Sequence, residues 1–358
     1  MTRNGKGPRY GMYLAVLPAY RRSCIEILRA EIGTDLQIWA SPAHLDPSVT
    51  TGIPKAWYSP TRMIRIAGRA FIQVGSFLTA LRTRSLVVDL NPRSITAWAL
   101  LVSRRVLGRQ TSAWGHLHSQ NGTEAPTAAL RRMMRRLATN TVVYTYSSRD
   151  LALKEMVGRK VFVAANALYR REDIHPDSNI ARLTILYVGR FVKAKKVRVL
   201  IEAFGLLADT IPSIKLVLVG GGEEEPILRA LVHELGLTDN VEFRGWIEDL
   251  EELRTIYSRA FISVSPGFAG LQITQSMGFG VPILISKDEP HSPEVELAAA
   301  DADPWFVSNS PEALADKLRQ RFASRADVPL EHLSRKVRTE YSAETMAAGL
   351  RDALMDRS

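Results

Sequence analysis

The sequence has 358 residues, 46% of them hydrophobic and 23% charged, which is typical of folded globular chains and excludes a largely disordered one. That length suits two domains, no apolar run is long enough to predict a membrane-spanning helix, and the single cysteine, Cys24, excludes an internal disulfide. Residues 1–166 hold 24 Lys and Arg against 8 Asp and Glu, a net charge of +16, so the other 192 residues, with 23 against 29, carry −6.

The first half alternates short apolar runs with helical patterns, which predicts parallel strands joined by crossover helices. Apolar runs predict buried strands over residues 12–17, 36–40, 86–90, 111–114, 141–145 and 161–165. Apolar residues at helical spacing predict helices over residues 64–81, 95–107 and 128–137. Cys24 lies in an amphipathic segment and is predicted to belong to the core.

Polar residues follow two of these predicted strands. The strand over residues 86–90 ends at Asn91 and Pro92, and the strand over 111–114 is followed by His116 and His118. Ligands of open α/β sheets bind at the carboxyl ends of strands, so Asn91, Pro92 and His118 are predicted to contact a ligand. A histidine there can donate to an oxyanion or a hydroxyl, and His116 is predicted to be catalytic. The alternative for both histidines is a purely structural role.

The helix predicted over residues 128–137 is strongly basic. Four arginines, from Arg131 to Arg136, flank the pair Met133 and Met134. Helices of this kind lie on anionic membranes, although a solvated helix face is an equal alternative. With the +16 charge, this pattern predicts an anionic membrane surface as a partner. No helix-turn-helix, zinc or aromatic single-strand motif accompanies the basic charge, so no nucleic acid is expected.

A polar stretch without periodicity, residues 168–181, is predicted to link two domains. The expected organisation is a first domain over residues 1–167 and a second over 182–340. Residues 341–358 are predicted to form a closing helix with Met346, Leu350 and Leu354 on one face.

The second half repeats the strand–helix alternation, with strands predicted over residues 184–188, 215–219, 241–243, 261–264 and 282–285. The first of these strands runs into Gly189 and Arg190, and Lys195 follows just before a helix. Free N–H groups at a helix start, together with two cations, suit a diphosphate. The alternative is that both cations are ordinary solvated residues.

Three further segments of the second half predict ligand contacts. Glycines at the end of a buried strand let a ligand approach the backbone closely, although a tight turn alone is an equal explanation. Phe243 and Trp246 end the next strand, where a nucleobase could bind, and a glycine-rich loop with Gly270 and Leu271 precedes another helix. The three consecutive glycines are Gly220, Gly221 and Gly222.

The order of these segments resembles the C-terminal domain of family-4-like retaining glycosyltransferases of the GT-B fold. The matching pieces are VGR with the later lysine (188–190 and 195), VLVGGG (217–222), VEFRGW (241–246) and GLQITQSMGFGVP (270–282). The resemblance implies two Rossmann-like, doubly wound domains facing each other across a cleft, with the closing helix packing back on the first. It also implies that Arg190 and Lys195 hold the donor diphosphate and that residues 243–246 lie beside the base.

The sequence departs from that family at one pair of positions. The family has two glutamates separated by seven residues, and here those positions are Gly267 and Gln275. An amide can still hydrogen-bond a ribose, so Gln275 is predicted to bind the donor. Glu294 is the candidate for the missing carboxylate, with a solvated helix start as the alternative. The broken pair, and the WGH segment at residues 114–116, resemble a divergent subgroup of bacterial envelope-polysaccharide glycosyltransferases.

The expected activity is transfer of a sugar from a nucleotide diphosphate donor to a lipid-linked or polysaccharide acceptor. The resemblance implies retention of configuration, and His116, Arg190 and Lys195 are the predicted catalytic residues. No Cys and His cluster has metal-ligand spacing, so neither a metal nor a cofactor is expected. The predicted acceptor-side residues are Asn91, Pro92 and His118. A non-catalytic partner protein of the same fold is the first alternative, and a basic nucleic-acid binder is the second. The expected location is the cytoplasm, at the inner face of the cell membrane.

Overall fold

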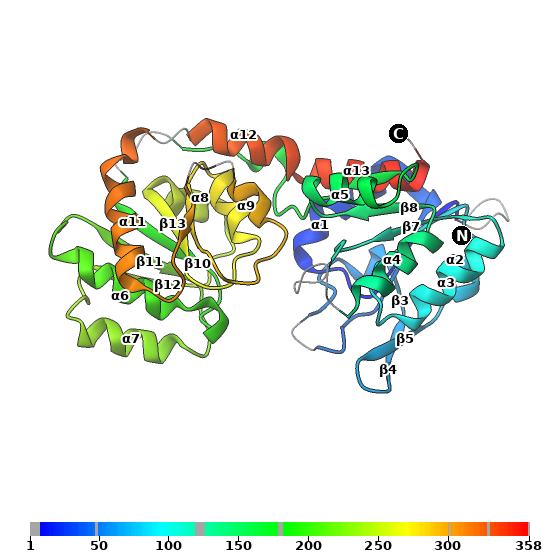
Figure 1. Cartoon of the computed structure of the whole chain (residues 1–358), viewed down its shortest axis with the longest axis horizontal. Helices are drawn as coiled ribbons and strands as arrows, with labels where there is room; N and C mark the ends of the chain where they lie inside the picture. The colour runs from blue at the N-terminus through cyan, green and yellow to red at the C-terminus, as the bar shows by residue number, and fades with distance from the viewer. Residues whose placement is uncertain are drawn as a thin grey trace. The chain divides into compact units, whose positions relative to one another are not determined.

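The computed structural model describes residues 8–46, 49–118, 126–177, 182–299, 301, 303–327 and 330–356, and it divides into two compact units (Figure 1). Unit 1 comprises residues 1–170 and 342–358, and unit 2 comprises residues 171–341. Each unit is built on its own parallel sheet, which confirms the predicted α/β class. Residues 178–181 of the predicted linker lie outside the described residues.

Unit 1 has a seven-stranded parallel sheet in the order β3-β2-β1-β6-β7-β8-β9. Its strands are β1 (Tyr10–Leu14), β2 (Leu36–Ala40), β3 (Ser59–Pro60), β6 (Ser85–Asp89), β7 (Gln110–Trp114), β8 (Asn140–Val143) and β9 (Val161–Val163). Its helices are α1 (Arg22–Ile32), α2 (Phe77–Arg82), α3 (Ile95–Val106), α4 (Ala128–Leu137), α5 (Tyr146–Glu155) and α13 (Ala343–Met355). Cys24 is buried in this core, as predicted.

The helix predicted over residues 64–81 is wrong. The segment forms an antiparallel hairpin, β4 (Arg62–Ile66) and β5 (Ala70–Val74), and only then the short helix α2. Ala67 and Gly68, with φ of 28° and 74°, make the tight turn between the strands. Apolar residues of the hairpin therefore alternate with a period of two, because successive side chains of a strand point to opposite faces.

Unit 2 has a six-stranded parallel sheet in the order β12-β11-β10-β13-β14-β15. Its strands are β10 (Thr184–Val188), β11 (Lys215–Val219), β12 (Val241–Gly245), β13 (Ala260–Ser265), β14 (Ile283–Ser286) and β15 (Trp305–Phe306). Its helices are α6 (Val197–Ala208), α7 (Glu225–Glu234), α8 (Leu250–Ser258), α9 (Gln272–Gly278), α10 (Val295–Ala298), α11 (Pro311–Ala323) and α12 (Leu330–Glu340). Its buried residues form one continuous apolar cluster around the sheet.

The closing helix α13 packs on unit 1, as the resemblance implied. Its buried residues Met346 and Leu350 join the core cluster of that unit, and Ser342 caps the helix by accepting from the N–H of Thr345. Gly349 brings α13 against β9, because a Cβ at this position would lie 1.8 Å from the carbonyl oxygen of Val163. The absence of a side chain at Gly349 is therefore a packing requirement.

Replacing Gly349 with alanine is expected to lower the free energy of unfolding by about 1–3 kcal/mol, because the helix must move away from β9. Gly205 of α6 is the matched control, since a Cβ there would meet its nearest atom at an ordinary 3.6 Å. Gly205→Ala should stabilise by up to about 1 kcal/mol through helix propensity alone. Thermal unfolding of the two variants measures the difference, and equal shifts would contradict the packing argument.

Candidate functional site

The strand order of unit 2 places a topological switch point between β10 and β13. Strands β11 and β12 extend the sheet beyond β10, and β14 and β15 extend it beyond β13. The chain therefore reverses its direction of winding between β10 and β13. Open α/β sheets bind their ligands at such a switch point, beyond the carboxyl ends of the strands. Gly189 and Arg190 follow β10 at this point, and the loop over residues 266–271 follows β13.

Two cations lie at this switch point without a carboxylate partner among the described residues. Lys195 is half-buried, and its Nζ donates to the carbonyl oxygen of Phe268 at 2.7 Å and to Oε1 of Gln272 at 3.4 Å. Burial, and then the charge of Arg190, lowers the pKa of Lys195 to about 8. Arg190 is exposed. A half-buried ammonium that faces only neutral oxygens is a site for an anion.

The three glycines after β11 pack on the turn that carries these cations. A Cβ at Gly220 would lie 1.9 Å from the oxygen of Gly189, and one at Gly222 would lie 2.4 Å from the oxygen of Phe191. Close contact between the two backbones therefore requires these glycines whether or not a ligand is bound. Gly221 lies between them, beside the indole of Trp246.

The predicted base-binding residues differ in their surroundings. The ring of Phe243 is half-buried against Phe191, and the guanidinium of Arg229 lies 4.2 Å from its centroid. Trp246 is 63% exposed, so its indole is free to stack on a ligand. Of the two aromatic residues, Trp246 is the accessible one.

The loop after β13 accounts for the missing glutamate at Gly267. A Cβ at Gly267 would lie 2.3 Å from the carbonyl oxygen of Ala194, in the short turn η5 (Lys193–Lys195), so the backbone leaves no room for a side chain. Gln275 accepts from the hydroxyl of Tyr257 at 3.2 Å. Glu294 is buried and accepts from the hydroxyl of Ser292. Gly270 and Leu271 lie immediately before α9.

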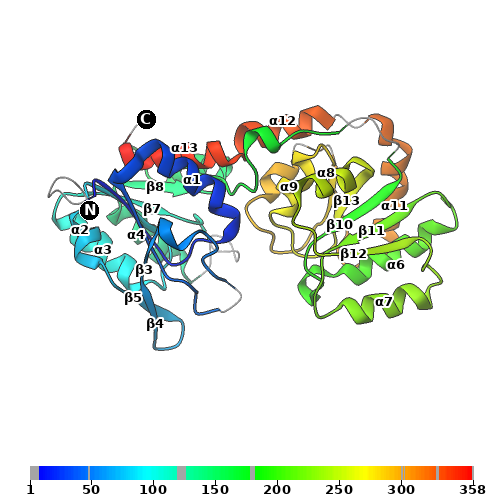
Figure 2. The same ribbon diagram turned by 180° about the vertical axis from the view of Figure 1, so that it is seen from behind.

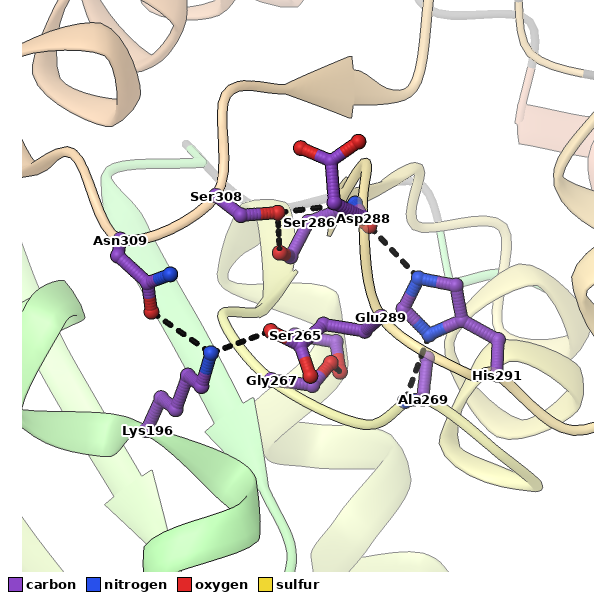
Figure 3. Close-up of polar contacts among 10 residues, drawn as sticks. All are labelled: Lys196, Ser265, Gly267, Ala269, Ser286, Asp288, Glu289, His291, Ser308 and Asn309. Atoms are coloured by element: carbon purple, nitrogen blue, oxygen red, sulfur yellow. Dashed lines mark hydrogen bonds and ion pairs between the residues drawn. The ribbon is translucent and has the colours of Figure 1, made fainter. Parts of the chain in front are cut away.

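A polar network that the sequence did not predict holds these loops together (Figure 3). Lys196, in a left-handed conformation with φ of 50°, contacts Glu289 after β14 and donates to Oδ1 of Asn309 at 2.7 Å. His291 accepts from the N–H of Ala269 at 3.0 Å, so its other nitrogen carries the proton and donates to the oxygen of Ser286. The neutral ring of His291 thus fixes the loop that follows β13.

Unit 1 has its own switch point, between β1 and β6, and a carboxylate lies there. Asp89, the last residue of β6, accepts from the N–H of Ala15, which follows β1. Burial raises the pKa of Asp89 to about 6, against this hydrogen bond and the charge of Arg21, while the residue keeps partial contact with solvent. A carboxyl group with a raised pKa at a strand end is a candidate for acid–base or binding chemistry.

Arg21 is buried beside Asp89 in a cage of aromatic residues. Its guanidinium lies 4.3 Å from the ring of Trp114 and donates to the hydroxyl of Tyr144 at 2.9 Å and to Asn166 at 3.4 Å. Within the described part of the chain, Nε of Arg21 and the indole N–H of Trp114 are buried without a hydrogen-bond partner. Unused buried donors of this kind mark a place for a bound water or ligand group.

The predicted acceptor-side residues lie near this cluster with different surroundings. His116 is exposed as a whole residue, but its ring packs edge-on against Tyr144, with 4.8 Å between the ring centroids. Desolvation of the ring, with the charges of Arg131 and Arg21, lowers the pKa of His116 to about 4. The ring is therefore neutral at pH 7. Nε2 of His118 lies 3.4 Å from Glu155.

The other two predicted acceptor-side residues make local contacts. Oδ1 of Asn91 accepts from the N–H of Arg93 at 3.0 Å, and the carbonyl of Pro92 accepts from the indole of Trp98 at 3.1 Å. Among the described residues, no group of three or more His, Cys, Asp or Glu is arranged to hold a metal ion. No helix in that part of the chain is long and apolar enough to cross a membrane.

Residues 170–339, which make up nearly all of unit 2, match the family model of the glycosyl transferases group 1. Unit 2 therefore carries the signature of this family. Among curated proteins, the chain is similar to the lipopolysaccharide core biosynthesis glycosyltransferase LpsE of Rhizobium meliloti, with 32% identity over 29% of this chain and 30% of LpsE. It is also similar to the exopolysaccharide phosphotransferase SCO2592 of Streptomyces coelicolor, with 25% identity over 77% of this chain and 29% of that protein.

The match to these two curated relatives covers about a third of the length of each. Among solved structures, the chain shares its fold with Anabaena HepE, at 12% identity and a TM-score of 0.69, over 97% of this chain and 100% of HepE. It also shares its fold with a sucrose-phosphate synthase of Thermosynechococcus elongatus, at 18% identity and a TM-score of 0.63, over 98% and 100% of the two chains. The shared fold confirms the expected GT-B architecture, and residues 170–339 match the group 1 glycosyl transferases.

The sequence missed five residues that the structure brings to the two switch points, namely Arg21, Asp89, Lys196, Gln272 and His291. Gln272 could have been predicted, because it is the first residue of the helix that follows a glycine-rich loop already predicted to bind the donor. Arg21 and Asp89 gave no comparable signal, because a lone arginine and a lone aspartate have no characteristic spacing.

Proposed function

We propose that the chain transfers a sugar from a nucleotide diphosphate donor to a lipid-linked or polysaccharide acceptor during synthesis of a cell-envelope glycan. The observation that carries the proposal is the pair Arg190 and Lys195 at the switch point of unit 2, with no carboxylate partner there among the described residues. Anabaena HepE, which has the same fold, has been crystallised in complex with UDP and with UDP-glucose, and this supports a nucleotide sugar as donor.

The proposed chemistry is electrostatic. As the bond between the sugar and the diphosphate breaks, negative charge grows on the leaving diphosphate, and Arg190 and Lys195 stabilise it. Two protein cations can fulfil this role without a metal ion, so we propose a metal-independent reaction. Retention of configuration is proposed on the family resemblance alone.

The acceptor is proposed to bind unit 1. His116 presents a neutral ring at the end of β7, and Asp89 and Arg21 lie at the switch point of the same sheet. A neutral imidazole can donate to or accept from a hydroxyl group, and a carboxylate accepts from one. We propose the inner face of the cell membrane as the place of action, where lipid-linked acceptors would be found.

A panel of nucleotide sugars, screened for thermal stabilisation and then for release of free nucleoside diphosphate, tests the proposed reaction. The expected result is stabilisation by one class of donor, followed by nucleotide release when an acceptor is added. Stabilisation without release under any acceptor would favour the alternative, a non-catalytic protein of this fold. Gly267, which cannot contact a sugar through a side chain, is the feature that keeps this alternative open.

Binding of nucleoside diphosphate is expected to weaken as the pH rises through about 8. Because the pKa of Lys195 is lowered to about 8 in the free protein, its charge is present at pH 7 and is lost above that value. Affinity should fall by at most about tenfold per pH unit above the pKa. Arg190 stays charged, and His291 beside Lys195 is already neutral because its pKa is lowered, so neither changes in this range.

Titration calorimetry of wild type and Lys195→Arg between about pH 7 and pH 9 measures this effect. The guanidinium of the variant keeps its charge throughout, so its affinity should vary much less with pH. The same pH dependence in both proteins would contradict the assignment to Lys195.

A further inference from the structure

The β4–β5 hairpin projects from the rest of unit 1 in both views (Figures 1 and 2). It forms a two-stranded sheet of its own, with no strand pairing to the seven-stranded sheet. Phe71 and Gln73 point inward and are only 1% and 4% exposed. One face of the hairpin is therefore anchored in the unit, and the opposite face is turned outward.

The outward face is apolar. In the antiparallel register Ile64 lies opposite Ile72, Ile66 opposite Ala70, and Arg62 opposite Val74, so these residues share one face. The side chains of Ile64, Ile66 and Val74 are 37%, 36% and 51% exposed. In α2, directly after the hairpin, Leu78 is 62% exposed. No described element covers these residues.

The part of the chain that contains this apolar face is rich in positive charge. Residues 47–149 contain 15 Lys and Arg but only two acids, Asp89 and Glu124, which gives a net charge of +13. Asp89 lies at the end of β6, and Glu124 is outside the described residues. Arg62, Arg65 and Arg69 on the hairpin are exposed, and no carboxylate pairs with them among the described residues.

We propose that the β4–β5 hairpin docks the protein on an anionic lipid bilayer, with its isoleucines in the interfacial region and its arginines on lipid phosphates. Amphipathic elements with aliphatic and basic residues bind such surfaces through apolar burial and electrostatic attraction together. A second copy of the chain is a poorer occupant, because pairing two such hairpins would bring like charges together. The proposal goes beyond the sugar transfer and does not depend on the donor site.

The proposed lipid-binding surface lies on the β4–β5 hairpin and not on the basic helix α4. In α4, Arg135 pairs with Glu155, and Arg131 donates to the carbonyl oxygens of Leu90 and His116, so both are bound within the unit. Only Arg132 and Arg136 of its four arginines are fully exposed. The sequence pattern that predicted a membrane helix therefore reflects, in part, internal contacts.

Co-sedimentation of the full chain with vesicles tests the proposal. One set of vesicles contains phosphatidylcholine alone, and the other contains roughly one third phosphatidylglycerol. Wild type should bind the anionic vesicles only, and rising salt should release it. Arg62→Gln with Arg69→Gln should weaken binding roughly thirtyfold. Ile64→Ser with Ile66→Ser should weaken it roughly tenfold.

The matched control is Arg132→Gln with Arg136→Gln on α4, which removes the same charge and should weaken binding less than about threefold. An equal loss in this control, or equal binding of wild type to both vesicles, overturns the proposal. The proposal is also overturned if the protein sediments in the absence of vesicles and the isoleucine substitutions abolish this sedimentation. In that case a second copy of the chain covers the apolar face. All variants should bind nucleoside diphosphate like wild type, so failure of the donor site is detected separately.

Discussion

Replacing Lys195 or Arg190 with alanine is expected to weaken binding of nucleoside diphosphate by roughly ten- to a hundredfold. Each change removes one charge-assisted contact to the phosphates at the switch point between β10 and β13. The rate of sugar transfer should fall further than the affinity, because the charge on the leaving diphosphate is larger in the transition state than in the bound donor. Titration of nucleoside diphosphate and steady-state rates measure the two effects.

Lys193 offers a matched control, since it lies in the same short turn as Lys195 but is exposed. Lys193→Ala removes an equal charge and should change the affinity by less than about threefold, because exposed charges are screened. Unchanged affinity in both Lys195→Ala and Arg190→Ala would place the donor elsewhere. An equal loss in all three variants would mean that general positive charge attracts the nucleotide.

Substitution of His116 by alanine is expected to lower turnover about a hundredfold or more while leaving donor binding unchanged. The residue lies in unit 1, at the end of β7, whereas the proposed diphosphate site lies in unit 2. His116 is neutral at pH 7 because desolvation and two nearby arginines lower its pKa, so it can take part in one hydrogen bond to a reacting hydroxyl. The turnover number and the donor affinity are the quantities to compare.

His118 is the control for that experiment. It lies two residues further along the chain, and its ring is near Glu155. His118→Ala should keep at least about a third of the wild-type turnover, because its observed contact is with Glu155. Full activity in His116→Ala would show that His116 is structural. A parallel loss of activity in both variants would point to a disturbed loop after β7 and not to chemistry at His116.

The sequence predicted the parallel sheets well, because buried strands have a strong local signal. The predicted bounds of β2, β10 and β11 agree with the structure, and Gly189, Arg190 and Lys195 follow β10 in the predicted arrangement. The hairpin was missed, because the apolar residues at positions 64, 71, 72 and 78 recur at seven, eight and fourteen residues, which also fits one face of a helix. The turn at Ala67 and Gly68 decides between a helix and a hairpin, and a single glycine is weak evidence for a turn.

The site of unit 1 could not be predicted in the same way. Arg21 reaches Tyr144 and Asn166, more than a hundred residues along the chain, and Asp89 reaches Ala15. Such contacts depend on which strand ends lie side by side, and the strand order is not visible in the sequence. For Gly267 the sequence already showed that the carboxylate is missing. Only the structure shows the reason, which is that the carbonyl oxygen of Ala194 occupies the space of a side chain.

The membership of α13 in unit 1 has a consequence for the order of folding during synthesis. Unit 2 is one continuous stretch, residues 171–341, and every part of it is made before α13. Domains fold as units while the chain emerges, so unit 2 can reach its final packing first. Unit 1 must wait for the last helix, and until then the core surface that receives Met346 and Leu350 stays uncovered. A chain that ends before residue 343 should therefore have a protease-resistant unit 2 and a protease-sensitive unit 1.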